Sequence, residues 1–127
     1  MKDARDVRHR SMEKQCFLGM DGYQGYHQVE VDDETSRYLS FTCPRGSYRY
    51  LRGTMGTPGM PQHFQRVMSE QVLHGLDGDV CDVFVDDLPI YGVGPAGEQR
   101  VWEQDALENL RAVFERCRKH NVKLSTV

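Results

Sequence analysis

The sequence predicts an α+β fold in which an antiparallel sheet carries helices on one face and a small hairpin is inserted. Extended runs rich in apolar and aromatic residues alternate with two segments of helical periodicity, and a Pro/Gly turn separates two aromatic-rich runs. The predicted order is strand, small hairpin, helix, hairpin, helix and a possible last strand. Without the inserted hairpin this order is βαββαβ, the ferredoxin-like split βαβ arrangement.

The composition narrows the class of protein. The 127 residues suit one domain, and the net charge of −3 provides no general basic field, so any binding of nucleic acid must be local. Cys16, Cys43, Cys81 and Cys117 are too widely spaced for a zinc motif and predict reduced thiols in an intracellular protein. No apolar run resembles a membrane span or a signal peptide, so we expect no membrane contact.

The first half of the chain predicts one strand and one hairpin. Polar residues 3–16 favour a short helix or an arm. Residues 18–21 favour a strand that is broken by Gly22 and Gly25 and followed by a turn carrying Tyr26. Residues 38–42 and 47–51 flank a Pro/Gly turn, which is typical of a hairpin.

The second half predicts a helix, a second hairpin and a longer helix. Pro61 suits the first turn of a helix that runs to about Leu76. Residues 80–85 and 88–93 are expected to pair as strands, and a helix with one apolar stripe follows the loop at residues 94–97. Residues 121–124 could begin one more strand.

Three aspartates are candidates for a metal site. Asp21 lies at the end of the first strand, and Asp86 and Asp87 lie at the tip of the second hairpin. Carboxylates on two strands can hold two divalent ions for phosphoryl transfer, and oxygen ligands favour magnesium or manganese. Because neighbours in a regular strand face opposite ways, a turn must reorient Asp86 and Asp87. Ordinary turn residues are the alternative, since aspartate is common in turns.

Four motifs occur in order along the chain. They are Asp21 followed by Gly25-Tyr26-His27-Gln28-Val29, then Pro44-Arg45-Gly46-Ser47-Tyr48, then a glycine-rich block with Gly56, Pro61, Phe64 and Gln65, and last Phe84-Val85-Asp86-Asp87-Leu88. Together they resemble the palm of the reverse transcriptases of gypsy-like LTR retrotransposons, retroviruses and pararetroviruses, over roughly residues 16–124. Four ordered motifs are far more specific than one, and they favour the metal site over ordinary turns.

The resemblance implies nucleotidyl transfer to a primer 3′-hydroxyl. Asp21, Asp86 and Asp87 would be the catalytic residues. Asp21 and Asp86 would be the primary metal ligands, Asp87 an auxiliary one, and the backbone carbonyl of Gly22 an extra ligand. The cofactors would be two ions of Mg²⁺ or Mn²⁺, which activate the hydroxyl and neutralise the triphosphate.

The resemblance also implies contacts to substrates. Tyr26 matches an aromatic residue that closes over the nucleotide sugar and favours deoxynucleotides, although a core tyrosine is the alternative. Gln65, together with Phe64, is also expected to hold its helix against the glycine-rich loop. The rest of the substrate-binding set is Gly22, Met55, Gly56 and Gly59. The inserted hairpin carries three arginines that could contact template phosphates or be solvated surface residues: Arg45, Arg49 and Arg52.

The chain also departs from the family pattern. The N-terminal half of the fingers, the thumb and the ribonuclease H region have no counterpart, so residues 1–127 are expected to form a single partial domain of palm and part of the fingers. The segment Leu124-Ser125-Thr126-Val127 lacks a lysine of the family, and Gly59-Met60 replaces Asn-Ala. Pro89 is unfavourable inside a central strand, where it implies a bulge or a drifted copy.

These observations leave two hypotheses. The first is the palm of an RNA-directed DNA polymerase that acts on an RNA or DNA template with primer and deoxynucleoside triphosphates, with weak or no activity for this chain alone. The second is a degenerate or domesticated palm that serves as a non-catalytic binding or structural module. A nucleotide cyclase or RNA-dependent RNA polymerase is disfavoured by Gly25-Tyr26-His27-Gln28. We expect a cytoplasmic, nuclear or virus-like-particle location, and self-association or packing against missing parts through exposed apolar surface.

Overall fold

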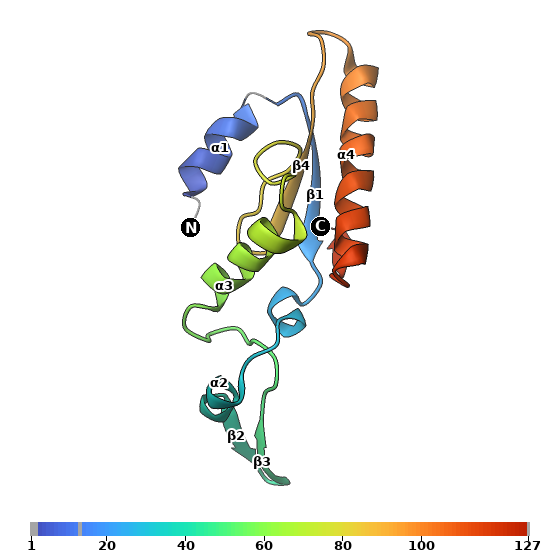
Figure 1. The fold of residues 1–127 in the computed structure, drawn as a ribbon. Helices are drawn as coiled ribbons and strands as arrows, with labels where there is room; N and C mark the ends of the chain where they lie inside the picture. Colours follow the sequence, from blue (N-terminus) through green and yellow to red (C-terminus); the bar gives the residue numbers. More distant parts are fainter. Residues whose placement is uncertain (1–2, 13, 127) are drawn as a thin grey trace.

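The computed structural model of the chain describes residues 3–12 and 14–126 (Figure 1). The elements in chain order are α1 (Ala4–Met12), β1 (Cys16–Gly22), the 3-10 helix η1 (Gly25–Gln28), α2 (Asp33–Tyr38), β2 (Ser40–Cys43), β3 (Gly46–Arg49), α3 (Met60–Val67), the π-helical turn η2 (Met68–Val72), β4 (Asp87–Gly92), α4 (Gln99–Lys119) and β5 (Leu124–Thr126). Pro61 lies in the first turn of α3, as predicted. α3 continues into η2, which ends at Val72, a few residues before the predicted end near Leu76.

The main sheet has three antiparallel strands in the order β4-β1-β5. β1 pairs with β4 from Cys16↔Gly92 to Asp21↔Asp87, and β5 pairs with the other edge of β1. Residues 80–84 run along the outer edge of β4 through isolated bridges. With this segment counted, the spatial order is that of the split βαβ arrangement. The predicted antiparallel α+β fold and its last strand are therefore confirmed.

The prediction of a regular strand over residues 80–85 is wrong. This segment makes only single bridges to β4, at Cys81↔Ile90 and Phe84↔Asp87. The cause lies partly in Pro89, whose carbonyl accepts a 3.0 Å hydrogen bond from the Asp82 N–H but which has no N–H to donate in return. Its missing donor faces this outer segment and not β1, so β4 itself stays regular and needs no bulge.

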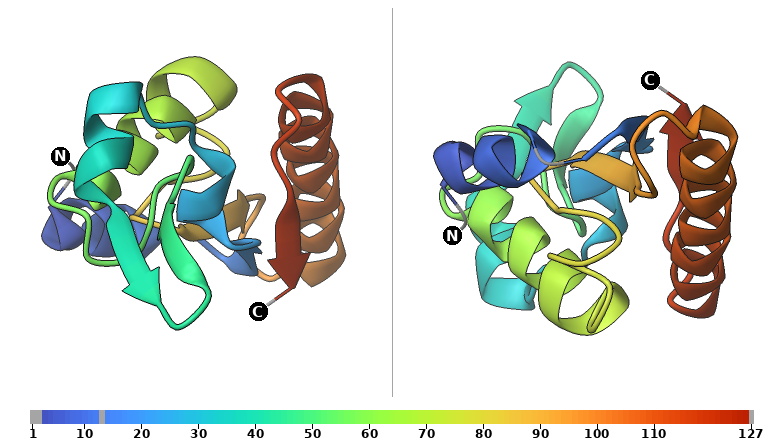
Figure 2. Two further views of the ribbon diagram at one scale, coloured as in Figure 1. Left: turned by 90° about the horizontal axis from the view of Figure 1, so that it is seen from below. Right: turned by 90° about the horizontal axis from the view of Figure 1, so that it is seen from above.

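The core lies between one face of the sheet and the helices α3 and α4, which is the face predicted for them. Met20 of β1 and Leu88 and Ile90 of β4 point into it. The helical side of the core is formed by Phe64, Met68, Val72, Leu73, Val113 and Cys117. α1 lies on the opposite side of the sheet from α4, as Figures 1 and 2 both show. None of the helices in the described ranges is long and apolar enough to cross a membrane.

The inserted hairpin of β2 and β3 forms as predicted and extends away from the main sheet (Figure 1). It packs beside α2, a short helix that the sequence analysis did not predict. Asp32 caps α2, because its side chain accepts a 2.7 Å hydrogen bond from the Thr35 N–H. Phe41, Tyr48 and Tyr50 form a half-exposed stack on the hairpin.

Gly92 allows α4 to approach the end of β4. A Cβ atom at this position would overlap the carbonyl oxygen of Trp102 and lie 2.8 Å from Cβ of Ala106.

We expect Gly92→Ala to lower the free energy of unfolding by about 2–3 kcal/mol, because the added methyl group must displace backbone. Urea unfolding measures this change. Val93→Ala is the matched control at the exposed next position and should stay within about 0.5 kcal/mol of the original chain; equal stability of both variants would contradict the close packing.

Candidate functional site

The structure brings the three predicted aspartates together. Asp21 near the end of β1 and Asp87 at the start of β4 are directly opposite each other in the β1–β4 pairing, and Asp86 precedes Asp87 in the turn. One carboxylate oxygen from each residue lies within 4.8 Å of the others. The three side chains therefore share one site at the end of the β1–β4 ladder where the hairpin turns.

The turn between residues 84 and 87 provides the reorientation that adjacent aspartates require. The N–H of Phe84 donates to the carbonyl of Asp87 at 3.0 Å, and the N–H of Asp87 donates to the carbonyl of Phe84 at 2.9 Å. Two residues form the loop, and Val85 has a φ of 58°. A positive φ is typical of two-residue hairpin loops but unusual for a β-branched residue. The Gly22 N–H donates to the Asp86 carbonyl at 3.0 Å and ties this loop to β1.

The charges at this site fit a divalent cation. Oδ1 of Asp21 is buried and has no hydrogen-bond partner among the described residues. Burial, followed by the negative charges of Asp86 and Asp21, raises the pKa of the Asp87 carboxyl above its ordinary value. An unpaired buried carboxylate oxygen within a group of like charges is unfavourable without a counterion. The oxygen-only donor set matches magnesium or manganese, so these residues fit the predicted metal.

Tyr26 packs against the core and is affected by the charge of Asp86. Its ring packs edge-on against Phe64, with 5.7 Å between the ring centroids. Burial, and secondly the charge of Asp86, raises the pKa of its phenol. The packing of Tyr26 on Phe64 agrees with the alternative of a core tyrosine, and the effect of the Asp86 charge agrees with a residue near the metal site. Its role as a sugar gate stays a prediction.

The other predicted substrate residues lie in the glycine-rich loop and in α3. Met55 and Gly56 are exposed in the glycine-rich loop, and Gly59 precedes α3 with a φ of 75°. Gln65 is almost buried, and its Nε2 donates to the carbonyl of Val83 at 3.1 Å. It therefore connects α3 to the segment before Asp86, whereas the sequence analysis expected it to hold the glycine-rich loop. These contacts are all within the chain, so the substrate-binding roles of these residues stay predictions.

The three arginines of the inserted hairpin are exposed. Arg49 forms an ion pair with Asp33 at 2.8 Å, and Arg52 forms one with Glu30 at 3.1 Å. Arg45 lies in the turn between β2 and β3. Two of the three arginines predicted to contact nucleic acid thus already pair with acidic neighbours. Their contacts with nucleic acid stay predictions.

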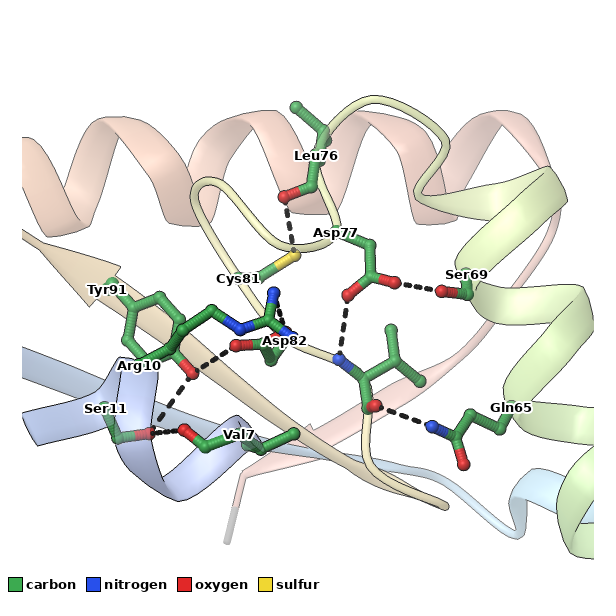
Figure 3. A network of polar contacts seen from close by, with 11 residues as sticks. Val7, Arg10, Ser11, Gln65, Ser69, Leu76, Asp77, Cys81, Asp82 and Tyr91 are labelled. Atoms are coloured by element: carbon green, nitrogen blue, oxygen red, sulfur yellow. Dashed lines mark hydrogen bonds and ion pairs between the residues drawn. The ribbon is translucent and has the colours of Figure 1, made fainter. Parts of the chain in front are cut away.

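Two groups of polar contacts surround the segment before the turn at residues 84–87 (Figure 3). The sequence analysis did not predict either group. In the first, the fully buried Asp82 accepts a 2.8 Å hydrogen bond from the Tyr91 hydroxyl and forms a 3.3 Å ion pair with Arg10 of α1. In the second, Gln65 and Asp77 contact Val83. An aspartate inside the apolar run of residues 80–85 was the one signal in the sequence for the first group.

Comparisons with known sequences agree with the geometry. A family profile described as "Reverse transcriptase (RNA-dependent DNA polymerase)" matches residues 1–126. The chain is 33% identical over 108 residues to the retrovirus-related Pol polyprotein from transposon 412 of Drosophila melanogaster, which covers 85% of this chain and 8% of that protein. It is 30% identical over 112 residues to the enzymatic polyprotein of cauliflower mosaic virus (strain NY8153), which covers 88% of this chain and 15% of that protein.

Solved structures show the same fold. The native prototype foamy virus protease-reverse transcriptase has a TM-score of 0.65 at 18% identity, over 81% of this chain and 12% of that one. The foamy viral enzyme in complex with an RNA/DNA hybrid has a TM-score of 0.61 at 19% identity, over 80% of this chain and 12% of that one. The chain thus spans a small part of the length of the relatives that it matches.

Tyr91 gives the fold a specific dependence on alkaline pH. Burial, opposed by the Ser11 hydroxyl and reinforced by Asp82, raises the pKa of Tyr91 from 10.0 to about 12. Because the fold favours the neutral phenol, the stability that Tyr91 contributes is complete below pH 10 and is lost as the pH rises toward 12. We expect the difference in free energy of unfolding between the original chain and Tyr91→Phe to fall by about 2–3 kcal/mol over this range.

Urea unfolding of both proteins at several pH values measures this difference. Burial also raises the pKa of Cys117 to about 11, but this thiol is present in both proteins and cancels in the comparison. A difference that is constant with pH would contradict the buried, hydrogen-bonded state of Tyr91.

Proposed function

Because this chain belongs to the reverse transcriptase (RNA-dependent DNA polymerase) family, we propose that it forms the metal-binding palm of an enzyme that transfers deoxynucleotides to a primer 3′-hydroxyl. The observation that carries this proposal is the cluster of Asp21, Asp86 and Asp87, whose carboxylate oxygens lie within 4.8 Å of one another. Pro89, which could have indicated a decayed copy, leaves β4 regular and does not disturb the cluster.

The proposed metal ligands are the three aspartates and the backbone carbonyl of Gly22. Two Mg²⁺ or Mn²⁺ ions, when bound, supply activation of the 3′-hydroxyl and neutralisation of the triphosphate charge. The chain itself contributes the spacing of Asp21 and Asp87, through the β1–β4 ladder, and a half-buried environment at Asp21 and Asp86 that strengthens their interaction with a cation.

The proposed substrates are deoxynucleoside triphosphates and a primer on an RNA or DNA template. Tyr26 supports this proposal because it packs on Phe64, and burial and then the charge of Asp86 raise the pKa of its phenol. Met55, Gly56, Gly59 and Gln65 are proposed to line the nucleotide and template site, and Arg45, Arg49 and Arg52 to approach template phosphates. One related foamy viral enzyme was solved with an RNA/DNA hybrid and another with double-stranded DNA.

Divalent metal binding is the first test of the proposal. Calorimetric titration of the chain with Mn²⁺ should give a saturable signal, and the double variant Asp21→Asn with Asp86→Asn should lose it. Saturating metal should also stabilise the original chain by about 2.7 kcal/mol at one hundred times Kd, because only the folded state forms the site. Asp79→Asn, an exposed acidic residue, is the control and should titrate as the original chain does. Superimposable titrations of the original chain and the double variant would refute the metal site.

Primer extension is the second test. With deoxynucleotides, Mg²⁺ and a primed RNA template, we expect weak or no synthesis by the 127-residue chain alone. Its net charge is −3, and Arg49 and Arg52 already pair with acidic neighbours, so little positive charge is available to hold nucleic acid. The double aspartate variant gives the background. Robust extension would show that the chain holds its template without further basic surface.

A further inference from the structure

Val83 lies three residues before Asp86 on the outer edge of the sheet and is fully buried. Its neighbours bond inward to β4: the Asp82 N–H donates to Pro89, and the Phe84 N–H donates to Asp87, both at 3.0 Å. Successive residues of an extended segment direct their backbone groups to opposite sides. Both polar groups of Val83 therefore point away from β4, where the sheet of the described residues has no further strand.

Two side chains form the hydrogen bonds to Val83 that a further strand would otherwise form. Asp77 Oδ1 accepts a 3.2 Å hydrogen bond from the Val83 N–H, and Gln65 Nε2 donates a 3.1 Å hydrogen bond to the Val83 carbonyl. The hydroxyl of Ser69 in turn donates to Asp77 Oδ2. Figure 3 shows Gln65 and Ser69 reaching from α3 and η2 toward Asp77 and this segment. Both buried backbone groups of Val83, its N–H and its carbonyl, are thus satisfied by side chains.

The orientation of Gln65 is set by this contact. Only its amide nitrogen can donate to a carbonyl, so the amide oxygen must point elsewhere. That oxygen is buried without a hydrogen-bond partner among the described residues. An apolar side chain of similar length would fill the same space without a buried unpaired oxygen. The hydrogen bond to Val83 is therefore what the amide supplies at this position.

We infer that Gln65 and Asp77 are positioning residues for the metal ligand Asp86, an inference that rests on the proposed function. Asp86 lies in a two-residue loop, and one arm of that loop, Asp87, is held by the β1–β4 ladder. The other arm leads back to Val83 through an irregular segment. The Gly22 N–H holds the Asp86 carbonyl from the β1 side, and the hydrogen bonds of Gln65 and Asp77 to the carbonyl and N–H of Val83 hold the remaining arm. The distance between Asp86 and the other carboxylates therefore depends in part on Gln65 and Asp77.

The test uses the Mn²⁺ dissociation constant of the full chain, measured by calorimetry well below the melting temperature. Gln65→Met, which removes the donor at similar volume, and Asp77→Leu, which removes the acceptor, should each raise Kd about tenfold or more. Asp77→Asn should stay within about twofold, because its amide oxygen can still accept from Val83 and its nitrogen can donate to Ser69. Gln62→Met and Asp79→Leu are matched controls at exposed positions and should leave Kd unchanged.

A second readout needs no metal. Amide hydrogen exchange at Phe84 and Asp87, whose N–H groups close the hairpin loop, should quicken in Gln65→Met and Asp77→Leu relative to amides of the β1–β4 ladder. A role in stability alone would lower the melting temperature and leave Kd and this local pattern as they are. Unchanged Kd in both variants, with Mn²⁺ bound normally, would overturn the inference and leave the proposed function intact. If the original chain binds no Mn²⁺, the proposed function fails, and unchanged exchange at the hairpin would then overturn the positioning role as well.

Discussion

The mutual repulsion of three carboxylates at one end of the β1–β4 ladder is the constraint on which the rest of the structure depends. Asp21 and Asp87 face each other across the two strands, and Asp86 is adjacent. One oxygen of Asp21 is buried without a partner among the described residues, and the raised pKa of Asp87 reflects burial and the two neighbouring charges. In an unfolded chain Asp21 would separate from the adjacent Asp86 and Asp87, so the fold must hold it beside them against an unfavourable interaction until a cation neutralises it. Such a site requires firm anchoring of both strands.

The anchoring comes from both faces of the sheet. On the core face, Met20, Leu88 and Ile90 pack with residues of α3, η2 and α4. On the opposite side, Arg10 of α1 reaches Asp82, and Tyr91 donates its hydroxyl proton to the same carboxylate. Only the Asp82 side of this ion pair is fully buried, and the cost of desolvating that carboxylate offsets much of the attraction to Arg10. The first helix therefore has a definite place relative to β4 although it lies far from it in sequence.

The sequence predicted the parts of this arrangement that have a local signature. The aspartate motifs and the Pro/Gly turn of the β2–β3 hairpin are short patterns, and the family that four of them indicated is confirmed. The capping aspartate of α2 was also a local signal, but the helix has only six residues and its preceding polar run resembles a loop. The apolar run at residues 80–85 matched a strand, but it makes only isolated bridges to β4, in part because Pro89 has no N–H to donate to it. The contacts of Arg10 with Asp82 and of Gln65 with Val83 join distant segments and have no sequence pattern of their own.

The site is therefore built from two parts of different rigidity. Asp21 and Asp87 belong to the regular ladder of β1 and β4, so the geometry of the sheet fixes their separation. Asp86 lies outside this ladder, and its carbonyl accepts a hydrogen bond from the Gly22 N–H at the end of β1. Its loop begins with Val85, which adopts a left-handed conformation that is strained for a β-branched side chain. Strain in a loop persists only where the surrounding structure holds both of its arms. Here the sheet holds Asp87 and the carbonyl of Asp86, and side chains hold the arm at Val83, so the position of the third carboxylate depends in part on residues outside the metal site.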